Sequence, residues 1–428
     1  MNNQGLPFHR FYKYDFASTQ VFLGLSSKYY GVSISAHVLA YTPTSVVQLL
    51  NQVRKPFFID PITYVFARSI RNISRNGRMR RSFRKLVEND YKQPFLQCVT
   101  NNSALTPMTF KNLAGGLDDS AITSMCPRVL DFQKTKCRAL TSFPKYNTLL
   151  KKGVVLSPLS PTFLVAPYFL AERHGDDWYK ISLRSAQISR SLKQHFDLYA
   201  VLCISRGMLW DTGQIRNVIQ DYAGHDGYII WVDDFDEAAL TSSDILGIKE
   251  LVSGLSKYGK PIYSLYGGYL CDLLGKIGLS GYSSGICYGE KRSVDAIGGG
   301  AGNRYYVTIS HSKISEDLAN AFFAQSTGNL RYMCPCETCS DIRRNIPSTV
   351  TPQEYADRFF AQMDFLDYRR HFVNIKYLEM NALDSQSIPQ VIVSIDSDVT
   401  SVSSIDPFPG QQQELKPFSL RIWRSLFA

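Results

Sequence analysis

The chain has 428 residues, of which 44% are hydrophobic and 13% aromatic, and this composition excludes a mainly disordered protein. Lys and Arg total 47 against 37 Asp and Glu, so the net charge is +10 at pH 7. This excess favours a polyanionic partner such as nucleic acid, with ordinary solubilising charge as the alternative.

Cysteine use and hydropathy indicate a soluble, cytoplasmic protein. The nine cysteines are an odd number, and several lie in apolar, strand-like runs, which is unlike a secreted disulfide framework. The N-terminus lacks the apolar core of a signal peptide, and no run of 18 apolar residues predicts a membrane span. We therefore expect reduced thiols and no membrane partner.

The first third of the chain combines mixed patterns with one basic stretch. We expect residues 1–55 to form an N-terminal segment that packs on the main domain. Residues 56–60 predict a short buried strand that ends on Asp60, before the turn residue Pro61. Helical patterns fill residues 62–160. Within them, one stretch has eight basic residues and no acidic one: Arg68, Arg71, Arg75, Arg78, Arg80, Arg81, Arg84 and Lys85.

This basic stretch is the best candidate nucleic-acid surface in the sequence. Arg and Lys side chains neutralise backbone phosphates, which makes the affinity fall steeply with salt. The alternatives are a solvated helix face or a binding site for an acidic partner protein. We expect the phosphate contacts to come from six residues: Arg71, Arg75, Arg78, Arg80, Arg81 and Arg84.

Strand and helix patterns alternate regularly after residue 160. Five apolar segments predict strands, at residues 162–169, 198–204, 227–232, 261–265 and 281–288. Amphipathic segments such as residues 242–258 separate them. This alternation predicts an α/β fold with a parallel sheet. Because the strand before Asp60 brings the number to at least six, a closed (β/α)8 TIM barrel over residues 56–330 fits better than an open sheet.

A cysteine cluster follows a Gly-rich loop at residues 298–304. Cys334, Cys336 and Cys339 lie within six residues, in a polar turn that contains Pro. Three thiolates at this spacing can converge on one tetrahedral ion, and His371, 32 residues further on, is the candidate fourth ligand. A closed Cys3His set predicts a structural Zn²⁺. The alternatives are coincidental cysteines or an iron–sulfur cluster, which needs a fourth Cys.

The zinc-binding subdomain is expected to cover residues 331–383. Thr351 as N-cap and Pro352 in the first turn predict the start of a long helix. This helix should run to about Leu383 and carry His371.

A C-terminal extension is expected over residues 384–428. Residues 384–417 are rich in Ser, Gln, Asp and Pro, which predicts a linker or meander. The apolar and aromatic residues of the last segment are expected to pack on the core or on a partner.

The CxCxxC knuckle, followed by a His on a helix and preceded by a barrel, resembles the tRNA-guanine transglycosylase superfamily over about residues 50–385. In that superfamily zinc holds a small subdomain against the end of a (β/α)8 barrel. This chain departs from the family pattern, because Pro-Ile-Thr-Tyr follows Asp60 in place of Ser-Gly-Gly-Phe-Gln, and residues 281–290 lack the usual Asp.

These departures are more similar to the divergent bacterial and phage branch that inserts 7-deazaguanine bases into DNA. Four elements carry the resemblance to this branch: Ile-Asp-Pro at 59–61, Trp-Val-Asp-Asp-Phe at 231–235, Tyr-Gly-Gly-Tyr at 266–269 and Tyr-Gly-Glu at 288–290.

Base exchange in a nucleic acid needs a nucleophile on C1′ and a group that transfers protons on the leaving and entering bases. The target nucleotide must be flipped out or unpaired. In a barrel these groups should lie at the carboxyl ends of strands, where Asp60, Asp233 and Asp234 occur. Asp234 is the preferred nucleophile and Asp60 the preferred proton-transfer residue. The alternatives are exchanged roles, or capping and turn roles.

Other strand ends supply candidate substrate contacts. Gly267 and Gly268 allow a planar base to approach the backbone, with a simple tight turn as the alternative. Glu290 can accept hydrogen bonds from the N–H edge of a guanine-like base, with a surface ion pair as the alternative. Arg206 is a candidate contact to the substrate or to phosphate.

We therefore expect a zinc-containing enzyme that exchanges guanine in DNA for a 7-deazaguanine precursor, preQ0, through a covalent Asp–nucleotide intermediate. The same chemistry on tRNA and a non-catalytic nucleic-acid-binding barrel are the alternatives. The resemblance also implies a helper ATPase and a later enzyme that elaborates the inserted base.

Overall fold

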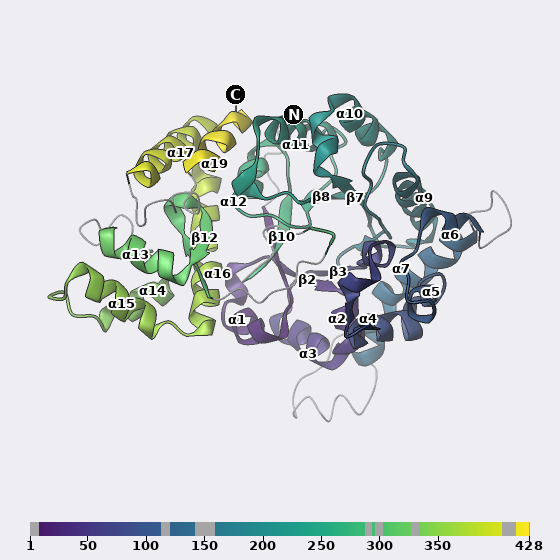
Figure 1. Ribbon diagram of the computed structural model, residues 1–428, viewed down its shortest axis with the longest axis horizontal. Helices are drawn as coiled ribbons and strands as arrows, with labels where there is room; N and C mark the ends of the chain where they lie inside the picture. The colour runs from purple at the N-terminus through teal and green to yellow at the C-terminus, as the bar shows by residue number, and fades with distance from the viewer. Residues whose placement is uncertain are drawn as a thin grey trace.

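The computed structural model describes residues 8–112, 120–141, 159–286, 293–295, 303–326, 334–404 and 417–427. Figure 1 shows a central barrel with helices around it and a group of C-terminal helices on one side, at the left of the view. Within the described ranges, no helix is long and apolar enough to cross a membrane. The eight cysteines in these ranges form no disulfide.

Eight parallel strands form one sheet, in the order β3-β2-β1-β10-β9-β8-β7-β6. The backbone N–H of Thr162, just before β6, donates to the carbonyl of Phe57 in β3 at 2.8 Å, which closes the barrel. The strands therefore follow chain order around the barrel, and the predicted (β/α)8 fold is confirmed. The strands are β1 (His9–Lys13), β2 (Gly31–Ser35), β3 (Phe57–Asp60), β6 (Leu164–Val165), β7 (Leu198–Ser205), β8 (Gly227–Asp233), β9 (Ile262–Ser264) and β10 (Gly281–Gly285).

Two barrel strands come from the region predicted to lie outside the barrel. β1 and β2 pair with each other and, on either side, with β10 and β3. The prediction that residues 1–55 form a separate segment is therefore wrong, and Asp60 ends the third strand rather than the first. β1 contains the buried Arg10, whose Nε donates to the hydroxyl of Tyr282 at 2.8 Å. Because polar residues stand where an apolar run would mark a buried strand, these two strands are hard to predict from the sequence.

The helices between the strands cover the outside of the barrel (Figure 1). α9 begins after Asp176, whose carboxylate accepts a hydrogen bond from the N–H of Tyr179. α11 begins with a capping box formed by Thr241 and Asp244, and it confirms the helix predicted there. These covering helices are α1 (Thr19–Gly24), α2 (Ala36–Tyr41), α3 (Pro43–Val53), α9 (Asp177–Leu192), α10 (Thr212–Asp221), α11 (Ser242–Ser256) and α12 (Tyr269–Leu274).

The connection between β3 and β6 contains the basic stretch and begins at the carboxyl end of β3. A hairpin of β4 and β5 turns at Asn76 and Gly77, which both have positive φ, 52° and 70°. An Asn-Gly pair with these angles is typical of a two-residue hairpin. The elements are η3 (Thr63–Ala67), η4 (Ile70–Ile73), β4 (Ser74–Arg75), β5 (Arg78–Met79), α4 (Arg81–Leu86), η5 (Val87–Tyr91), α5 (Leu96–Thr100), α6 (Pro107–Asn112) and α7 (Ser120–Thr141).

After the barrel, the chain forms a two-stranded antiparallel sheet and a group of helices. The single helix predicted from Pro352 to Leu383 is two helices, because the backbone is extended at Met363 and Asp364 caps the second helix. Thr351 caps the first helix, as predicted. The elements are β11 (Arg304–Val307), β12 (Ser312–Ser315), α13 (Glu316–Ser326), α14 (Glu337–Arg344), α15 (Pro352–Gln362) and α16 (Phe365–Ser385).

The predicted linker at residues 384–417 contains a helix, α17 (Ile388–Ser403), so the prediction is wrong there. Its Ser and β-branched residues have low helix propensity, and packing against α19 (Pro417–Arg424) supports the helix instead. The last segment packs back on the core, as expected. Leu420 and Trp423 are buried, and Trp423 Nε1 donates to the carbonyl of Glu237 at 3.1 Å.

Candidate functional site

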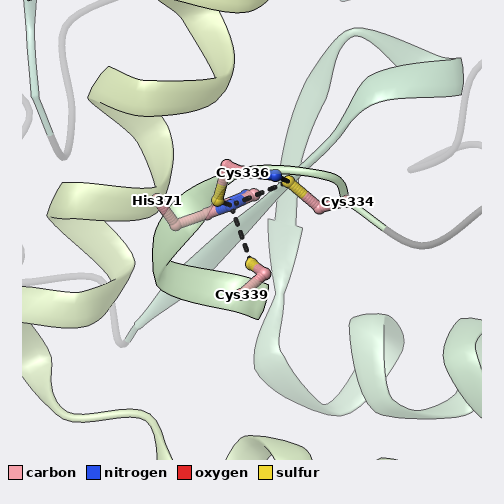
Figure 2. A group of neighbouring side chains, drawn as sticks. All are labelled: Cys334, Cys336, Cys339 and His371. Carbon is pink, nitrogen blue, oxygen red and sulfur yellow. Dashed lines mark hydrogen bonds between the residues drawn. The ribbon is translucent and has the colours of Figure 1, made fainter. Parts of the chain in front are cut away.

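The four predicted metal ligands lie together in one buried cluster, with the ring of His371 pointing at the three sulfurs (Figure 2). His371 Nδ1 lies 3.5, 3.4 and 3.2 Å from the Sγ atoms of Cys334, Cys336 and Cys339. A tetrahedral ion with usual Zn–S and Zn–N bond lengths would separate N and S by roughly 3.6 Å. The cluster therefore has the size and the donors to hold a metal ion.

The surrounding residues orient the four ligands. His371 Nε2 lies 2.8 Å from the carbonyl oxygen of Tyr306, so Nε2 carries the proton and Nδ1 faces the sulfurs. The hydroxyl of Tyr305 lies 3.3 Å from Cys339 Sγ, and its ring stacks on His371 with 4.1 Å between centroids. All four ligands are at most 3% exposed. The cluster is thus closed to solvent, as a structural site requires.

Local structure explains why the cysteines converge. Cys336 is the N-cap of α14, and one helical turn brings Cys339 to the same side. The N–H of Cys336 points to Cys334 Sγ at 3.4 Å. The positive end of the helix favours thiolates at this position. His371 comes from α16, so a bound ion would fasten α14 to α16.

α16 also fastens this region to the barrel through a buried ion network. The carboxylate of Asp272 in α12 binds Arg10 of β1 at 2.6 Å and Lys376 of α16 at 2.7 Å. Burial lowers the pKa of Lys376, but Asp272 and Glu379 outweigh it and hold the pKa well above its usual value. Removal of one partner would leave a buried charge unpaired, which is strongly destabilising.

At the barrel mouth, Asp60 is the most deeply buried of the predicted catalytic carboxylates, at 1% exposure. Its Oδ1 accepts hydrogen bonds from the Tyr168 hydroxyl at 2.8 Å and from the N–H of Ile62 at 3.0 Å. Burial and the Asp60 charge raise the pKa of Tyr168 well above its usual value, so this hydroxyl stays a donor. Oδ2 accepts no hydrogen bond from any residue that the structure describes.

Lys13, at the end of β1, is a residue of this site that the sequence did not single out. Its Nζ lies 3.6 Å from Asp60 Oδ2 and donates to the hydroxyl of Tyr266 at 2.8 Å. Trp231 packs against Tyr266, with 5.1 Å between ring centroids. In the sequence, Lys13 could have been found as a charged residue at the end of a strand. That required residues 9–13 to be recognised as a barrel strand.

The neighbouring acids Asp233 and Asp234 differ in their surroundings. Asp233 is half-buried, and its Oδ1 accepts a hydrogen bond from the N–H of Val294 at 2.6 Å. Burial raises its pKa. Asp234 is exposed on a left-handed turn with φ of 54°. Burial chiefly, then Asp233 and Asp60, raise the pKa of the Cys203 thiol, so both carboxylates lie near this one interior side chain.

Arg206 is held by the protein itself. Its guanidinium binds both oxygens of the buried Asp244, at 2.9 and 2.7 Å, and the carbonyl of Ala239 at 2.8 Å. Burial raises the pKa of Asp244, but the hydrogen bonds from Arg206 and Thr241 outweigh it and lower the pKa to about 2. A substrate that bound Arg206, as predicted, would therefore have to replace the ion pair between Arg206 and Asp244.

The glycine pair after β9 forms a compact turn. A Cβ on Gly267 would lie 2.2 Å from Cys271 Sγ, so the turn requires glycine there. The carboxylate of Glu237 accepts hydrogen bonds from the N–H groups of Gly268 at 2.5 Å and Leu270 at 3.0 Å. A base that approached this backbone would have to displace Glu237. The remaining predicted contact, Glu290, lies outside the described residues.

The six arginines predicted to bind phosphate are all exposed on the insertion after β3. The insertion is fixed to the mouth by Arg68, which pairs with Asp295 at 2.9 Å. The adjacent Val294 is the donor to Asp233. Val294 and Asp295 therefore contact both regions: Asp295 pairs with Arg68 of the basic insertion, and Val294 donates to Asp233 at the mouth.

Fold and site together define an α/β barrel with a buried Cys3His cluster that can hold a metal ion, and with carboxylates at the mouth beside a basic insertion. No family model matches the chain, and no curated protein matches it in sequence. The function is therefore inferred from the site.

Proposed function

We propose that the chain is a zinc-containing transglycosylase that exchanges guanine in DNA for a 7-deazaguanine precursor such as preQ0. The observation that carries this proposal is the carboxylate of Asp60, which has one oxygen held by two donors and a second without a hydrogen-bond partner among the described residues. A carboxylate held in this way suits covalent attack on a sugar carbon.

In the proposed reaction, Asp60 Oδ2 forms a bond to C1′ of a flipped-out deoxyguanosine. The C1′–N9 bond breaks, and its electron pair leaves with guanine. Asp233, whose pKa burial raises, gives a proton to the departing base and takes one from N9 of the entering base. The entering base then displaces Asp60 from C1′ and restores the free carboxylate.

This assignment differs from the nucleophile expected from the sequence. Asp234 was favoured, but it is exposed on a turn, where no described hydrogen bond fixes its carboxylate. Asp60 has an orienting donor in Tyr168 and a cation beside its second oxygen. Holding the attacking atom in the geometry of the reaction lowers its barrier.

Two further features support a nucleic-acid substrate and a structural zinc. The exposed arginines of the insertion present positive charge next to the mouth, which suits a phosphate backbone. The Cys3His donors favour Zn²⁺ and leave no open ligand position, so the ion would fasten α14 and the residues just before it to α16 without a chemical role.

The test measures base composition in cells that express the chain. Mass spectrometry of DNA and tRNA would compare wild type with Asp60→Ala, with any helper ATPase present in the cell. A 7-deazaguanine in DNA that depends on Asp60 supports the proposal. The same base in tRNA alone would identify the tRNA activity instead. If the chain bound nucleic acid but no modified base was found, the result would favour a non-catalytic nucleic-acid-binding barrel.

A further inference from the structure

Three strands meet at one ion pair in the barrel mouth. Lys13 ends β1, Asp60 ends β3 two strands away, and Tyr266 follows β9 on the other side. The ammonium group of Lys13 lies 3.6 Å from Asp60 Oδ2 and 2.8 Å from the hydroxyl of Tyr266. It also lies 4.9 Å from the centre of the Tyr266 ring.

From this geometry we propose that Lys13 is a positioning residue that holds its positive charge beside the Asp60 carboxylate and fixes the orientation of the reactive oxygen. The assignment rests on the proposed function. Lys13 does not react itself, because an ammonium ion has no free electron pair. Its role is to compensate the carboxylate charge where solvent is excluded.

Asp60 is buried, and buried charges in proteins are paired with a charge of opposite sign. Burial in a low-dielectric interior favours the neutral form of a carboxyl group, and an opposite charge within about 4–6 Å restores the ionised form. Lys13 is the cation in ion-pair contact with Asp60 among the described residues. The other titratable groups around the pair include hydroxyls, a thiol and an acid: Tyr64, Tyr91, Tyr168, Cys203, Asp233 and Tyr266. One further cation, Arg68, also acts on Cys203.

None of the hydroxyl, thiol and acid groups can supply a positive charge to Asp60, and the guanidinium of Arg68 is paired with Asp295 at 2.9 Å and Glu172 at 3.6 Å. Burial and the charge of Asp60 raise the pKa values of Tyr91 and Tyr168 well above the usual value, and burial does the same for Cys203, so all three stay neutral. Asp233 adds negative charge. Tyr266 instead holds Lys13 in place, because its hydroxyl accepts from Nζ and its ring faces the cation.

Lys13 is the more exposed partner of the ion pair. Its side chain is 19% exposed, whereas that of Asp60 is 2% exposed. A substitution at Lys13 therefore changes the charge beside Asp60 at a position that is partly open to solvent, and it leaves the enclosed carboxylate itself unchanged.

The experiment compares Lys13→Met, Lys13→Arg and Tyr266→Phe. Lys180→Met, an exposed lysine on α9, is the matched control. Two measurements are made on folded, metal-loaded protein. One is the pH profile of base exchange. The other is the pH titration of the Asp60 carboxyl ¹³C signal, assigned by its absence in Asp60→Asn.

In Lys13→Met, we expect the acid limb of the profile and the ¹³C titration to move upward together by roughly 1–3 pH units. Lys13→Arg should restore both, and Tyr266→Phe should give a smaller shift. An unchanged ¹³C titration in Lys13→Met, with that variant folded, would overturn the proposal. The ¹³C test needs no substrate. If wild type exchanged no base, the proposed function would fail, whereas a shifted ¹³C titration would still support the role of Lys13 on Asp60.

Discussion

The Cys3His cluster and the barrel mouth are built in opposite ways. In the cluster all four candidate ligand atoms converge and are closed off from solvent, and Tyr305 and Tyr306 hold His371. In the mouth, Asp60 keeps one oxygen without a hydrogen bond from any described residue. A closed polar cluster with satisfied hydrogen bonds stabilises a fold, whereas a buried polar atom without a hydrogen bond costs stability. The two regions therefore predict different responses to mutation.

Asp60→Asn should have the largest effect. It keeps the shape of the side chain but removes the nucleophilic charge, so base exchange should fall by about 10⁴-fold or more. Thermal unfolding and metal content should stay close to wild type. Asp234→Asn is the matched control, with a much smaller loss in the same assay. Equal losses in both variants would return Asp234 to the role that the sequence favoured.

His371→Ala or Cys336→Ser should act on stability rather than chemistry. Either change opens the Cys3His set, and the bound metal should fall from one equivalent per chain to well below half. The unfolding free energy should drop by about 3–5 kcal/mol, measured by denaturant titration. Chelation of wild type, followed by added Zn²⁺, is the reversible control. Full stability without metal would contradict a structural ion.

Arg206→Met tests whether Arg206 serves the fold or the substrate. The folded pKa of Asp244, about 2, lies below its unfolded value, so its ionisation stabilises the fold fully above the unfolded pKa. That contribution is lost as the pH falls towards 2. Without Arg206, the unfolding free energy at pH 7 should drop by about 2 kcal/mol, and its pH dependence below pH 4 should flatten.

The readout that separates the two roles of Arg206 is KM. A structural role leaves KM for the entering base within a few-fold of wild type once the protein is folded. A rise in KM of about 10²-fold would restore Arg206 as a substrate contact.

The basic insertion should give the smallest effect. Arg75→Ser and Arg78→Ser together remove two exposed charges from the β4–β5 hairpin. Affinity for DNA should fall by about tenfold, and the slope of log affinity against log salt should become less negative by roughly 1.8. Arg344→Ser, also exposed but next to the Cys3His cluster, is the control. If Arg344→Ser lowered the affinity for DNA equally, the basic insertion would not be a specific DNA-binding surface.

The sequence predicted the regions where local composition carries the signal. Residues 198–204 and 227–232 are apolar runs because these strands are buried on both faces, and they form β7 and β8. Residues 9–13 escaped prediction because Arg10 is buried inside an ion network, so the strand has no apolar run. The break at Met363 was also missed, since neither Gly nor Pro marks it.

By itself, the sequence determined the barrel class and the metal ligands, because strand–helix alternation and cysteine spacing are local patterns. Only the tertiary structure decided which strand ends face each other. It placed Lys13 beside Asp60, 47 residues further along the chain, and separated the surroundings of Asp233 and Asp234. Closure of the barrel sets these distances, and closure depends on hydrogen bonds between strands that no single segment encodes.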